Sequence, residues 1–290
     1  MTQRTIGFVG LGMMGAPMVR RLAGAGHALR LRDADAARAA ALRDALGAGD
    51  LTRAAAAELD LLITMLPDSA TVEAVLLGEG WIDALPPGAT VIDMSSSEPV
   101  RSRALGERLA GRGLGYLDAP VSGGVKRAVD GSLAILVGGE AALLARWRPV
   151  LEAMGTSVLH IGPAGAGHAA KALNNFVSAA GLLATVEALH VAERFGITPE
   201  AMTDVLNASS GRSNTSENKV KPFMLSGTFA SGFSLRLMDK DLGIAGALAE
   251  SVGYPLGFGR HCIATWHAVA REAAPTADHT EMYRLLPKEA

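Results

Sequence analysis

Three polar side chains near the start of one long apolar stretch have the chemistry for proton transfer. Lys171, Asn174 and Asn175 lie within 165–195, which is rich in alanine and leucine and contains no proline. Helix propensity favours about 28 residues of uninterrupted helix there, and a spacing of four places Lys171 and Asn175 on one helical face. Because an ammonium and a carboxamide are costly to bury, the pair belongs either to the solvent-exposed end of a surface helix or to an active site.

A glycine-rich turn upstream favours the active site. Residues 5–9 form a β-rich run, and residues 16–23 have helical character. Between them lie Gly10, Leu11, Gly12, Met13, Met14 and Gly15, which make a G-x-G-x-x-G pattern. In a strand, turn and helix of this kind, the glycines let a pyrophosphate approach the backbone at the helix N-terminus. We therefore expect these six residues to bind a dinucleotide.

An acidic residue indicates which dinucleotide binds. A second strand is expected at 28–32, and Asp33 follows it. An acid about 20 residues beyond the glycines hydrogen-bonds the ribose hydroxyls of NAD and repels the 2′-phosphate of NADP. Arg30 and Arg32 argue the other way, because a guanidinium can bind that phosphate. The sequence predicts NAD as the cofactor, with NADP as the less favoured alternative.

Strands and helices alternate over the first half of the chain. Further strands are expected at 60–65, 90–94, 115–118, 133–137 and 158–161, and further helices at 34–46, 53–58, 71–77 and 99–111. This alternation predicts a mostly parallel, doubly wound sheet with helices on both faces. Ligands then bind beyond the carboxyl ends of the strands, which is where 66–67, 95–97 and 122–124 fall.

The second half of the chain has a helical pattern. Helices are expected at 199–206, 242–252, 259–272 and 280–285, with a long ordered loop at 207–232. The sequence GPAG at 162–165 breaks the chain before the long helix. We expect a Rossmann-like dinucleotide-binding domain at 1–163 and an all-helical substrate and oligomerisation domain at 164–290, joined by that long interdomain helix.

Composition narrows the possible partners. The formal net charge is -2 and 19% of the residues are charged, so the chain lacks the excess of positive charge that would attract nucleic acid. Charged residues interrupt the apolar segment after Phe176, which favours a buried helix over a membrane span. A hydrophobic content of 49% suggests that another subunit covers part of the surface, as in a homodimer or homotetramer.

Histidine and cysteine usage bears on both chemistry and compartment. The seven histidines are scattered and Cys262 is the one cysteine, so we expect no metal site and no intramolecular disulfide. The first residues lack the layout of a signal peptide, which predicts a cytoplasmic protein. There is no G-x-S-x-G pattern for serine hydrolysis. His168, one turn before Lys171, is expected to be structural.

Four blocks of sequence carry a resemblance to a known family. They are GFVGLGMMGAPM at 6–17, DAPVSGGVKRAVDGSLAILVGG at 118–139, GAGHAAKALNN at 165–175 and MDKDLGIA at 238–245. In content and order they resemble the β-hydroxyacid dehydrogenases, which include 3-hydroxyisobutyrate dehydrogenase and tartronate semialdehyde reductase. The resemblance covers the whole length, and it implies a Rossmann-like domain, an all-helical domain and an active site in the cleft between them.

The resemblance also implies roles for individual residues. Lys171 is implied as the catalytic residue. The implied substrate-binding residues are Ser122, Gly123, Gly124, Asn174 and Asn175. The implied cofactor contacts, besides the glycine pattern and Asp33, are Leu66, Pro67, Ser96 and Lys240. By the same analogy 209–214 lines the cleft, where Arg212 either holds a second anionic group or only ties down the loop.

The expected reaction is the NAD-dependent interconversion of a small 3-hydroxy acid and its semialdehyde. Lys171 fits the role of general acid and base, because an amine can take the hydroxyl proton and an ammonium can return it. One alternative is an NADPH-dependent short-chain semialdehyde reductase or an imine reductase; imine reductases generally lack this lysine. A second is a catalytically silent NAD-binding relative, against which the presence of Lys171 and Asn175 argues.

Overall fold

The computed structural model describes residues 4–286, and the chain forms two compact units. The first unit extends to Lys171 and the second begins at Ala172. The division therefore falls inside α9 (Ala166–Phe195), a single helix of 30 residues.

The first unit is built on a sheet that has nine strands within the described residues. The strands are β1 (Thr5–Val9), β2 (Ala28–Arg32), β3 (Gly49–Asp50), β4 (Leu61–Thr64), β5 (Thr90–Asp93), β6 (Gly115–Asp118), β7 (Val121–Ser122), β8 (Ala134–Gly139) and β9 (Ser157–Gly162). Their order is β3-β2-β1-β4-β5-β6-β8-β7, and β9 pairs with β8. The pairs from β3 to β6 are parallel, whereas β8 is antiparallel to β6 and β7. The expected doubly wound, mostly parallel sheet is confirmed.

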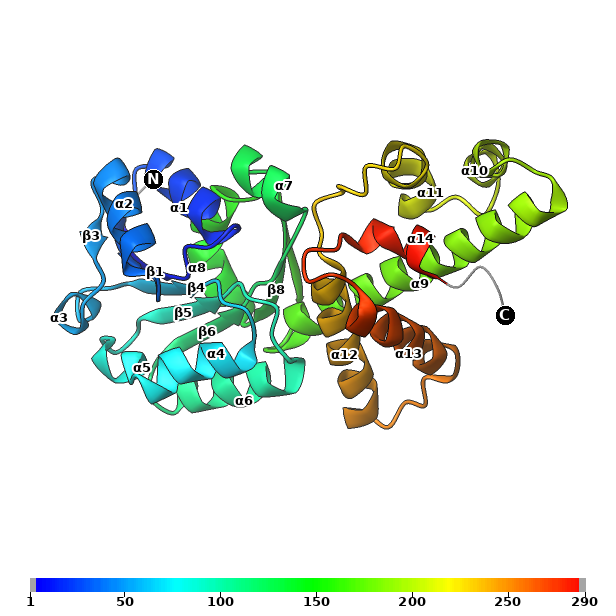
Figure 1. Cartoon of the computed structure of the whole chain (residues 1–290). Coiled ribbons are helices and arrows are strands. Elements are labelled where there is room, and N and C mark those ends of the chain that lie inside the picture. The colour runs from blue at the N-terminus through cyan, green and yellow to red at the C-terminus, as the bar shows by residue number, and fades with distance from the viewer. Residues whose placement is uncertain (1–3, 287–290) are drawn as a thin grey trace. The chain divides into compact units, whose positions relative to one another are not determined.

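Helices cover both faces of this sheet. They are α1 (Gly15–Gly24), α2 (Ala36–Leu46), α3 (Arg53–Ala56), α4 (Ser69–Glu73), the π-helical turn η1 (Ala74–Gly78), α5 (Trp81–Ala84), α6 (Pro99–Ala110), α7 (Gly124–Asp130) and α8 (Ala141–Glu152). Figure 1 shows α1 and α2 on one face and α4, α5 and α6 on the other. The helices pack apolar side chains against the sheet from both faces, and β4 and β5 are buried along their whole length.

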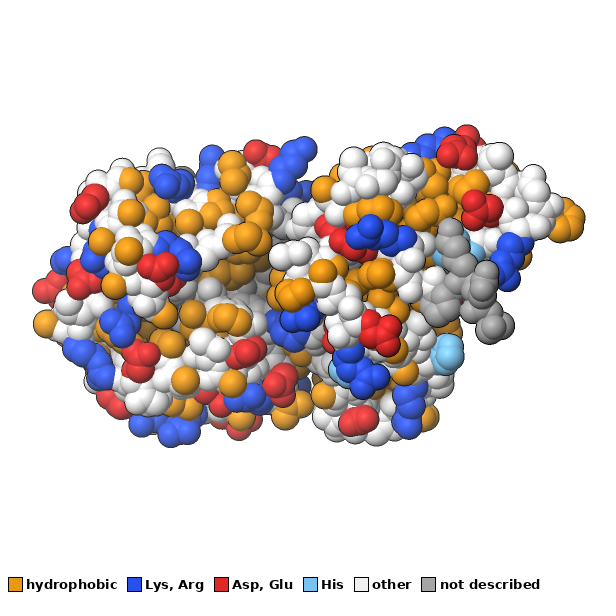
Figure 2. Space-filling model, viewed as in Figure 1, with side chains coloured by type: hydrophobic (Ala, Val, Ile, Leu, Met, Phe, Trp, Pro, Cys, Tyr) orange, Lys and Arg blue, Asp and Glu red, His pale blue; other side chains and the backbone are white. Residues whose placement is uncertain are grey.

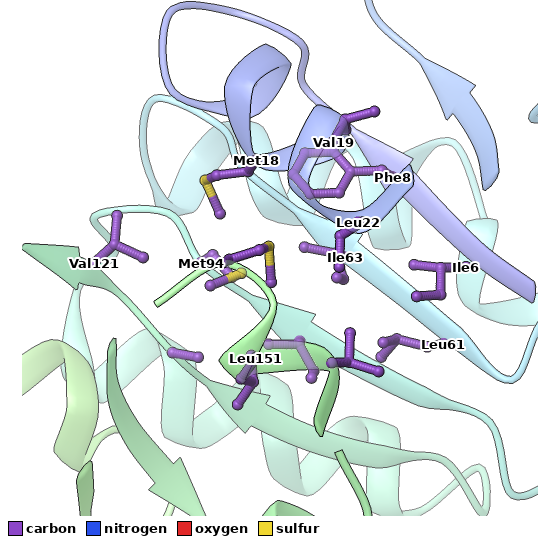
Figure 3. Close-up of a cluster of buried hydrophobic side chains, with 14 of the residues drawn as sticks. Ile6, Phe8, Met18, Val19, Leu22, Leu61, Ile63, Met94, Val121 and Leu151 are labelled. Carbon is purple, nitrogen blue, oxygen red and sulfur yellow. The ribbon is translucent and has the colours of Figure 1, made fainter. Parts of the chain in front are cut away.

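Two apolar cores hold the first unit together. On one face the side chains of α1, α2, α7 and α8 pack on the strands, and Figure 3 shows Met18, Val19 and Leu22 of α1 beside Phe8 of β1 and Ile63 of β4. On the other face α3 to α6 form the second core. Both cores pack against the same central strands. The pairing of β1, β4, β5 and β6 keeps their carboxyl ends in a fixed register.

The second unit is helical. After α9 come α10 (Pro199–Ala208), α11 (Asn214–Asn218), the π-helical turn η2 (Val220–Leu225), α12 (Leu235–Ser251), α13 (Gly257–Glu272), the 3₁₀ turn η3 (His279–Glu281) and α14 (Met282–Leu285). Its core combines Leu182, Val186 and Leu189 of α9 with Leu242 of α12 and Trp266 of α13. The expected all-helical second half is confirmed.

Two sequence expectations for the second unit were wrong in detail. The segment 207–232 is not a loop throughout, because α11 and η2 lie inside it. The residues of α11 are polar, so no apolar pattern predicts this helix from the sequence. Its start is stabilised by a capping box between Ser213 and Ser216. Helix α12 starts at Leu235 rather than Leu242, since Met238 and Asp241 are buried and continue its inner face.

Helix α9 is long and apolar enough to cross a membrane by length and composition. Half of its most apolar window is buried in the structure. Its inner residues pack in the core of the second unit, so we interpret it as a core helix.

Candidate active site

The glycine turn after β1 is shaped by close backbone contacts. Gly10 has a φ of 96°, and a Cβ there would lie 2.2 Å from the carbonyl oxygen of Met65. A Cβ at Gly15 would lie 1.9 Å from the oxygen of Gly10. At Gly12 a Cβ would meet nothing within 4 Å, so the turn is open on that side. Helix α1 begins at Gly15, and no side chain caps its N-terminus. Its first N–H groups can therefore bind an anion.

Asp33 is fixed beside the glycine turn. Its Oδ2 accepts a hydrogen bond of 2.5 Å from the Leu11 N–H, and its Oδ1 accepts one of 2.8 Å from the Asp35 N–H. The carboxylate therefore links the turn after β1 to the start of α2. This is where the ribose of a dinucleotide lies when its pyrophosphate rests on the glycines, so the chain fits NAD.

The two arginines near Asp33 have partners of their own. Arg32 donates a hydrogen bond of 3.0 Å to Glu79 and lies over the Trp81 ring, 5.1 Å from its centroid. The Arg30 side chain packs against Gly49. A 2′-phosphate would have to compete with Glu79 for Arg32, which weakens the case for NADP.

Polar contacts also order the loops that follow β4 and β5. Ser95 Oγ accepts a hydrogen bond of 2.8 Å from the Leu66 N–H and thereby joins the two loops. Asp93, which is buried, accepts hydrogen bonds from Thr64 Oγ1 at 2.9 Å and Ser97 Oγ at 2.8 Å. Two of the predicted cofactor contacts, Leu66 and Ser96, therefore lie on neighbouring loops at the carboxyl edge of the sheet.

The start of α9 is fastened to the same edge. Asp118, at the end of β6, accepts hydrogen bonds from the N–H groups of Gly165 at 2.7 Å and His168 at 2.8 Å. The His168 ring lies 2.7 Å from Ser102 Oγ and 3.1 Å from the carbonyl oxygen of Ser95. His168 is therefore structural, as the sequence suggested. One turn later comes Lys171, whose side chain is buried.

The glycines after Ser122 adopt left-handed backbone conformations. Gly123 has a φ of 128° and Gly124 a φ of 67°, values that favour glycine. A Cβ at Gly124 would meet nothing within 4 Å, whereas one at Gly123 would meet the Arg127 side chain. Consecutive backbone N–H groups in such a turn can receive a carboxylate.

The second unit contains a polar cluster between α9 and α12. Asn175 Nδ2 donates a hydrogen bond of 2.6 Å to Asp241 Oδ2, and Asn174 Nδ2 donates one of 3.2 Å to Asn175 Oδ1. Lys240 Nζ lies 3.8 Å from Asp241 Oδ1. Asn175 and Asp241 are both buried, so Lys240 and Asp241 are more than a surface pair.

The sequence identifies Lys240 as a candidate site residue but not its neighbour Asp241, although both lie in the MDKD block. The hydrogen bond from Asn175, 66 residues away, fixes the orientation of the Asn175 carboxamide. No group of three or more His, Cys, Asp or Glu that could hold a metal ion is found among residues 4–286.

Two family models match the chain. Residues 5–162 match the NAD binding domain of 6-phosphogluconate dehydrogenase, and residues 165–286 match the model described as NAD-binding of NADP-dependent 3-hydroxyisobutyrate dehydrogenase. A 2-(hydroxymethyl)glutarate dehydrogenase of Eubacterium barkeri is 38% identical over 255 residues, which are 87% of this chain and 84% of the relative. The chain belongs to the β-hydroxyacid dehydrogenase family.

Two further relatives cover nearly the whole chain. An NAD-dependent L-serine dehydrogenase of Pseudomonas aeruginosa is 33% identical over 97% of both proteins. A solved structure of Mycobacterium tuberculosis 3-hydroxyisobutyrate dehydrogenase with L-serine has 35% identity and a TM-score of 0.91, and covers 98% of this chain and 99% of that one. This member of the β-hydroxyacid dehydrogenases is an NAD-dependent oxidoreductase of hydroxy acids.

Proposed function

We propose that the enzyme interconverts a small 3-hydroxy acid and its semialdehyde, with Lys171 as general acid and base. The observation that carries the proposal is the anchorage of α9. Asp118 and His168 fasten its first turns to the carboxyl edge of the sheet, where the glycine turn and Asp33 also lie. The Lys171 backbone thus has a fixed place at the edge of the sheet where dinucleotide-binding folds hold their ligands.

Substrate chemistry in the relatives supports a 3-hydroxy acid. The names of the relatives specify 2-(hydroxymethyl)glutarate, 3-hydroxyisobutyrate and L-serine. All three carry a primary alcohol one carbon away from the carbon that bears the carboxylate. We assign the carboxylate to Ser122, Gly123 and Gly124, and the hydroxyl to Lys171 and Asn175.

The side chains then have complementary tasks. NAD, when bound, supplies the acceptor for the hydride of the alcohol carbon. Lys171 Nζ, as a neutral amine, takes the hydroxyl proton during oxidation and returns it to the alkoxide during reduction. Asn175, oriented by Asp241 and by Asn174, holds the oxygen without titrating. The glycine pattern, Leu66, Pro67, Ser96 and Lys240 are assigned to the cofactor.

The enzyme is further proposed to be a homodimer or homotetramer. Leu173, Val177, Val191 and Phe195 of α9 are exposed, and their spacing places them on one face of the helix. That face lies opposite the one that carries Lys171 and Asn175.

Light scattering tests the proposed assembly. The unaltered protein should have a mass greater than that of the monomer, and Val177→Glu should lower the measured mass. Val205→Glu, at an exposed valine of α10, is the control.

Two coarser assignments complete the proposal. We assign residues 1–163 to cofactor binding and 164–290 to substrate binding and self-association. A cytoplasmic location fits the single, buried Cys262, because cysteines stay reduced there.

Surface charge bears on the choice of partner. On the face drawn in Figure 2, acidic and basic side chains are interspersed, so that face has no extended basic surface for binding a polyanion.

A panel of 3-hydroxy acids assayed with NAD and with NADP tests the proposal. We expect NADH formation with at least one acid, and slower turnover with NADP at equal concentration. Reduction of an imine with NADPH, without oxidation of any hydroxy acid, would instead indicate an imine reductase. NAD binding without turnover of any acid would indicate a silent relative.

A further inference from the structure

A partly buried lysine of the second unit has no role in the reaction described so far. Lys219 lies between α11 and η2, and its Nζ donates a long hydrogen bond of 3.5 Å to Ser178 Oγ of α9. Among residues 4–286 no carboxylate oxygen lies within 4.0 Å of that nitrogen. Burial lowers the pKa of Lys219, and the more distant charge of Asp278 offsets part of this effect. A half-buried cation without a close counter-ion is costly, which suggests that an anion binds there.

The backbone around Lys219 is fixed by packing rather than left to move. Its carbonyl oxygen accepts hydrogen bonds from the N–H groups of Phe223 at 3.1 Å and Met224 at 3.2 Å. Val220 and Met224 are buried in the core of the second unit. The turn that follows Lys219 is π-helical, a conformation that is rare and occurs frequently at functional sites.

Ser178 links Lys219 to the face of α9 that carries the proposed substrate residues. It comes three residues after Asn175 and seven after Lys171, and these spacings place all three on one side of the helix. Seven residues correspond to about 10 Å of axial rise. The ammonium of Lys219 therefore marks a second cationic position farther along the same face.

The neighbouring cations are already paired. Arg212, the residue that the sequence offered for a second anionic group, is exposed and lies 3.5 Å from Glu217. It therefore ties down its own segment. Lys221 forms an ion pair with Asp204 of α10. Of the basic residues at 212–221, Lys219 is left for a ligand.

We propose that Lys219, with Ser178, binds a second carboxylate of the substrate. The preferred substrate is then a 3-hydroxy acid with a short side chain that ends in a carboxylate. This inference rests on the proposed function, because it extends the same substrate site along α9. A charge-assisted hydrogen bond from an ammonium to a carboxylate would replace the long bond to the serine hydroxyl.

Two acids of matched shape test the inference. 2-(Hydroxymethyl)glutarate and 2-(hydroxymethyl)pentanoate differ only in the end of the side chain, which is a carboxylate in one and a methyl group in the other. For the unaltered enzyme we expect kcat/KM for the diacid to be at least roughly tenfold higher, the worth of one charge-assisted hydrogen bond. Lys219→Met should abolish this preference and change kcat/KM for the monoacid by less than about threefold. Lys221→Met, the control, should keep the preference.

A binding measurement covers the case in which turnover is too slow to compare. Calorimetric titration of the NADH complex with the same two acids should show tighter binding of the diacid, and loss of that difference in Lys219→Met. Equal affinity for both acids, or a preference that survives Lys219→Met in folded protein, overturns the inference. If the enzyme oxidises the monoacid and shows no preference for the diacid, the inference about Lys219 is wrong and the proposed function is still supported. If no hydroxy acid reduces NAD, the proposed function itself is wrong.

Discussion

The two units assemble their proposed binding groups in different ways. In the first unit the groups are mostly backbone atoms at strand ends, such as the N–H groups around Gly12 and those after Ser122. In the second unit they are side chains from helices far apart in the sequence, as in the hydrogen bond between Asn175 and Asp241. A backbone site needs a particular local conformation, whereas a side-chain site needs two helices in register. The first kind is therefore encoded locally, and the second kind depends on packing.

Lys171→Ala removes the side chain in which the proposed chemistry is concentrated. We expect kcat to fall by roughly 10²-fold or more, the usual worth of a positioned acid and base, while NAD still binds. NAD titration by fluorescence and kcat at saturating hydroxy acid give the two readings, with Lys221→Ala as the control. A lower melting temperature with unchanged turnover would show that the lysine is only structural.

Asp278→Ala tests how far one side chain holds the second unit together. Burial alone would raise the pKa of Asp278, but hydrogen bonds from His279, Thr280 and Ser231 outweigh it and hold the pKa well below its usual range. Asp278 also accepts from the N–H groups of Gly232 and Phe233. We expect the variant to lose roughly 2 kcal/mol in the free energy of unfolding at pH 7, measured with urea.

The pH dependence of the same variant provides a sharper reading. Because the folded pKa is depressed, the stabilisation by Asp278 is present above the unfolded pKa of about 4 and is lost as pH falls toward the folded pKa. The unaltered protein should therefore lose stability between pH 4 and pH 3, by urea midpoint, more steeply than Asp278→Ala. Parallel curves would place the acid sensitivity elsewhere.

Two alanine substitutions separate structure from binding in the glycine turn. Gly10→Ala should lower the melting temperature, because φ is 96° and the Met65 carbonyl oxygen is 2.2 Å from the new Cβ. Gly12→Ala should leave the melting temperature unchanged and weaken NAD binding roughly tenfold, since its Cβ enters open space needed by the pyrophosphate. A stable Gly12→Ala with normal NAD affinity would contradict the placement of the cofactor on this turn.

The smallest effect is expected at Asp33. Asp33→Asn keeps an oxygen for the Leu11 N–H but loses the charge, so we expect NAD affinity to fall roughly fivefold and NADP affinity to be no weaker. Fluorescence titration with both dinucleotides measures the ratio. Faster turnover of the unaltered enzyme with NADP than with NAD would mean that Arg32 leaves Glu79 to bind the 2′-phosphate.

The sequence determined the local elements of both units. Alternating apolar runs located most of the strands to within a residue or two, and the glycine pattern located the turn after β1, because strand and turn formation depend on neighbouring residues. The long helix was equally clear from composition. Short helices such as α11 were missed, since in a polar segment the capping side chains rather than an apolar period define them.

Only the tertiary structure decided which polar residues meet. Nothing near Asp241 in the sequence predicts that Asn175 binds it, and nothing near Lys219 predicts its place beside Ser178 of α9. Helical periodicity gives the face on which a side chain lies, but the packing of α12 and η2 decides what that face meets. A buried polar group must find its partner wherever the core brings one within hydrogen-bond distance, so these contacts belong to the fold and not to any single segment.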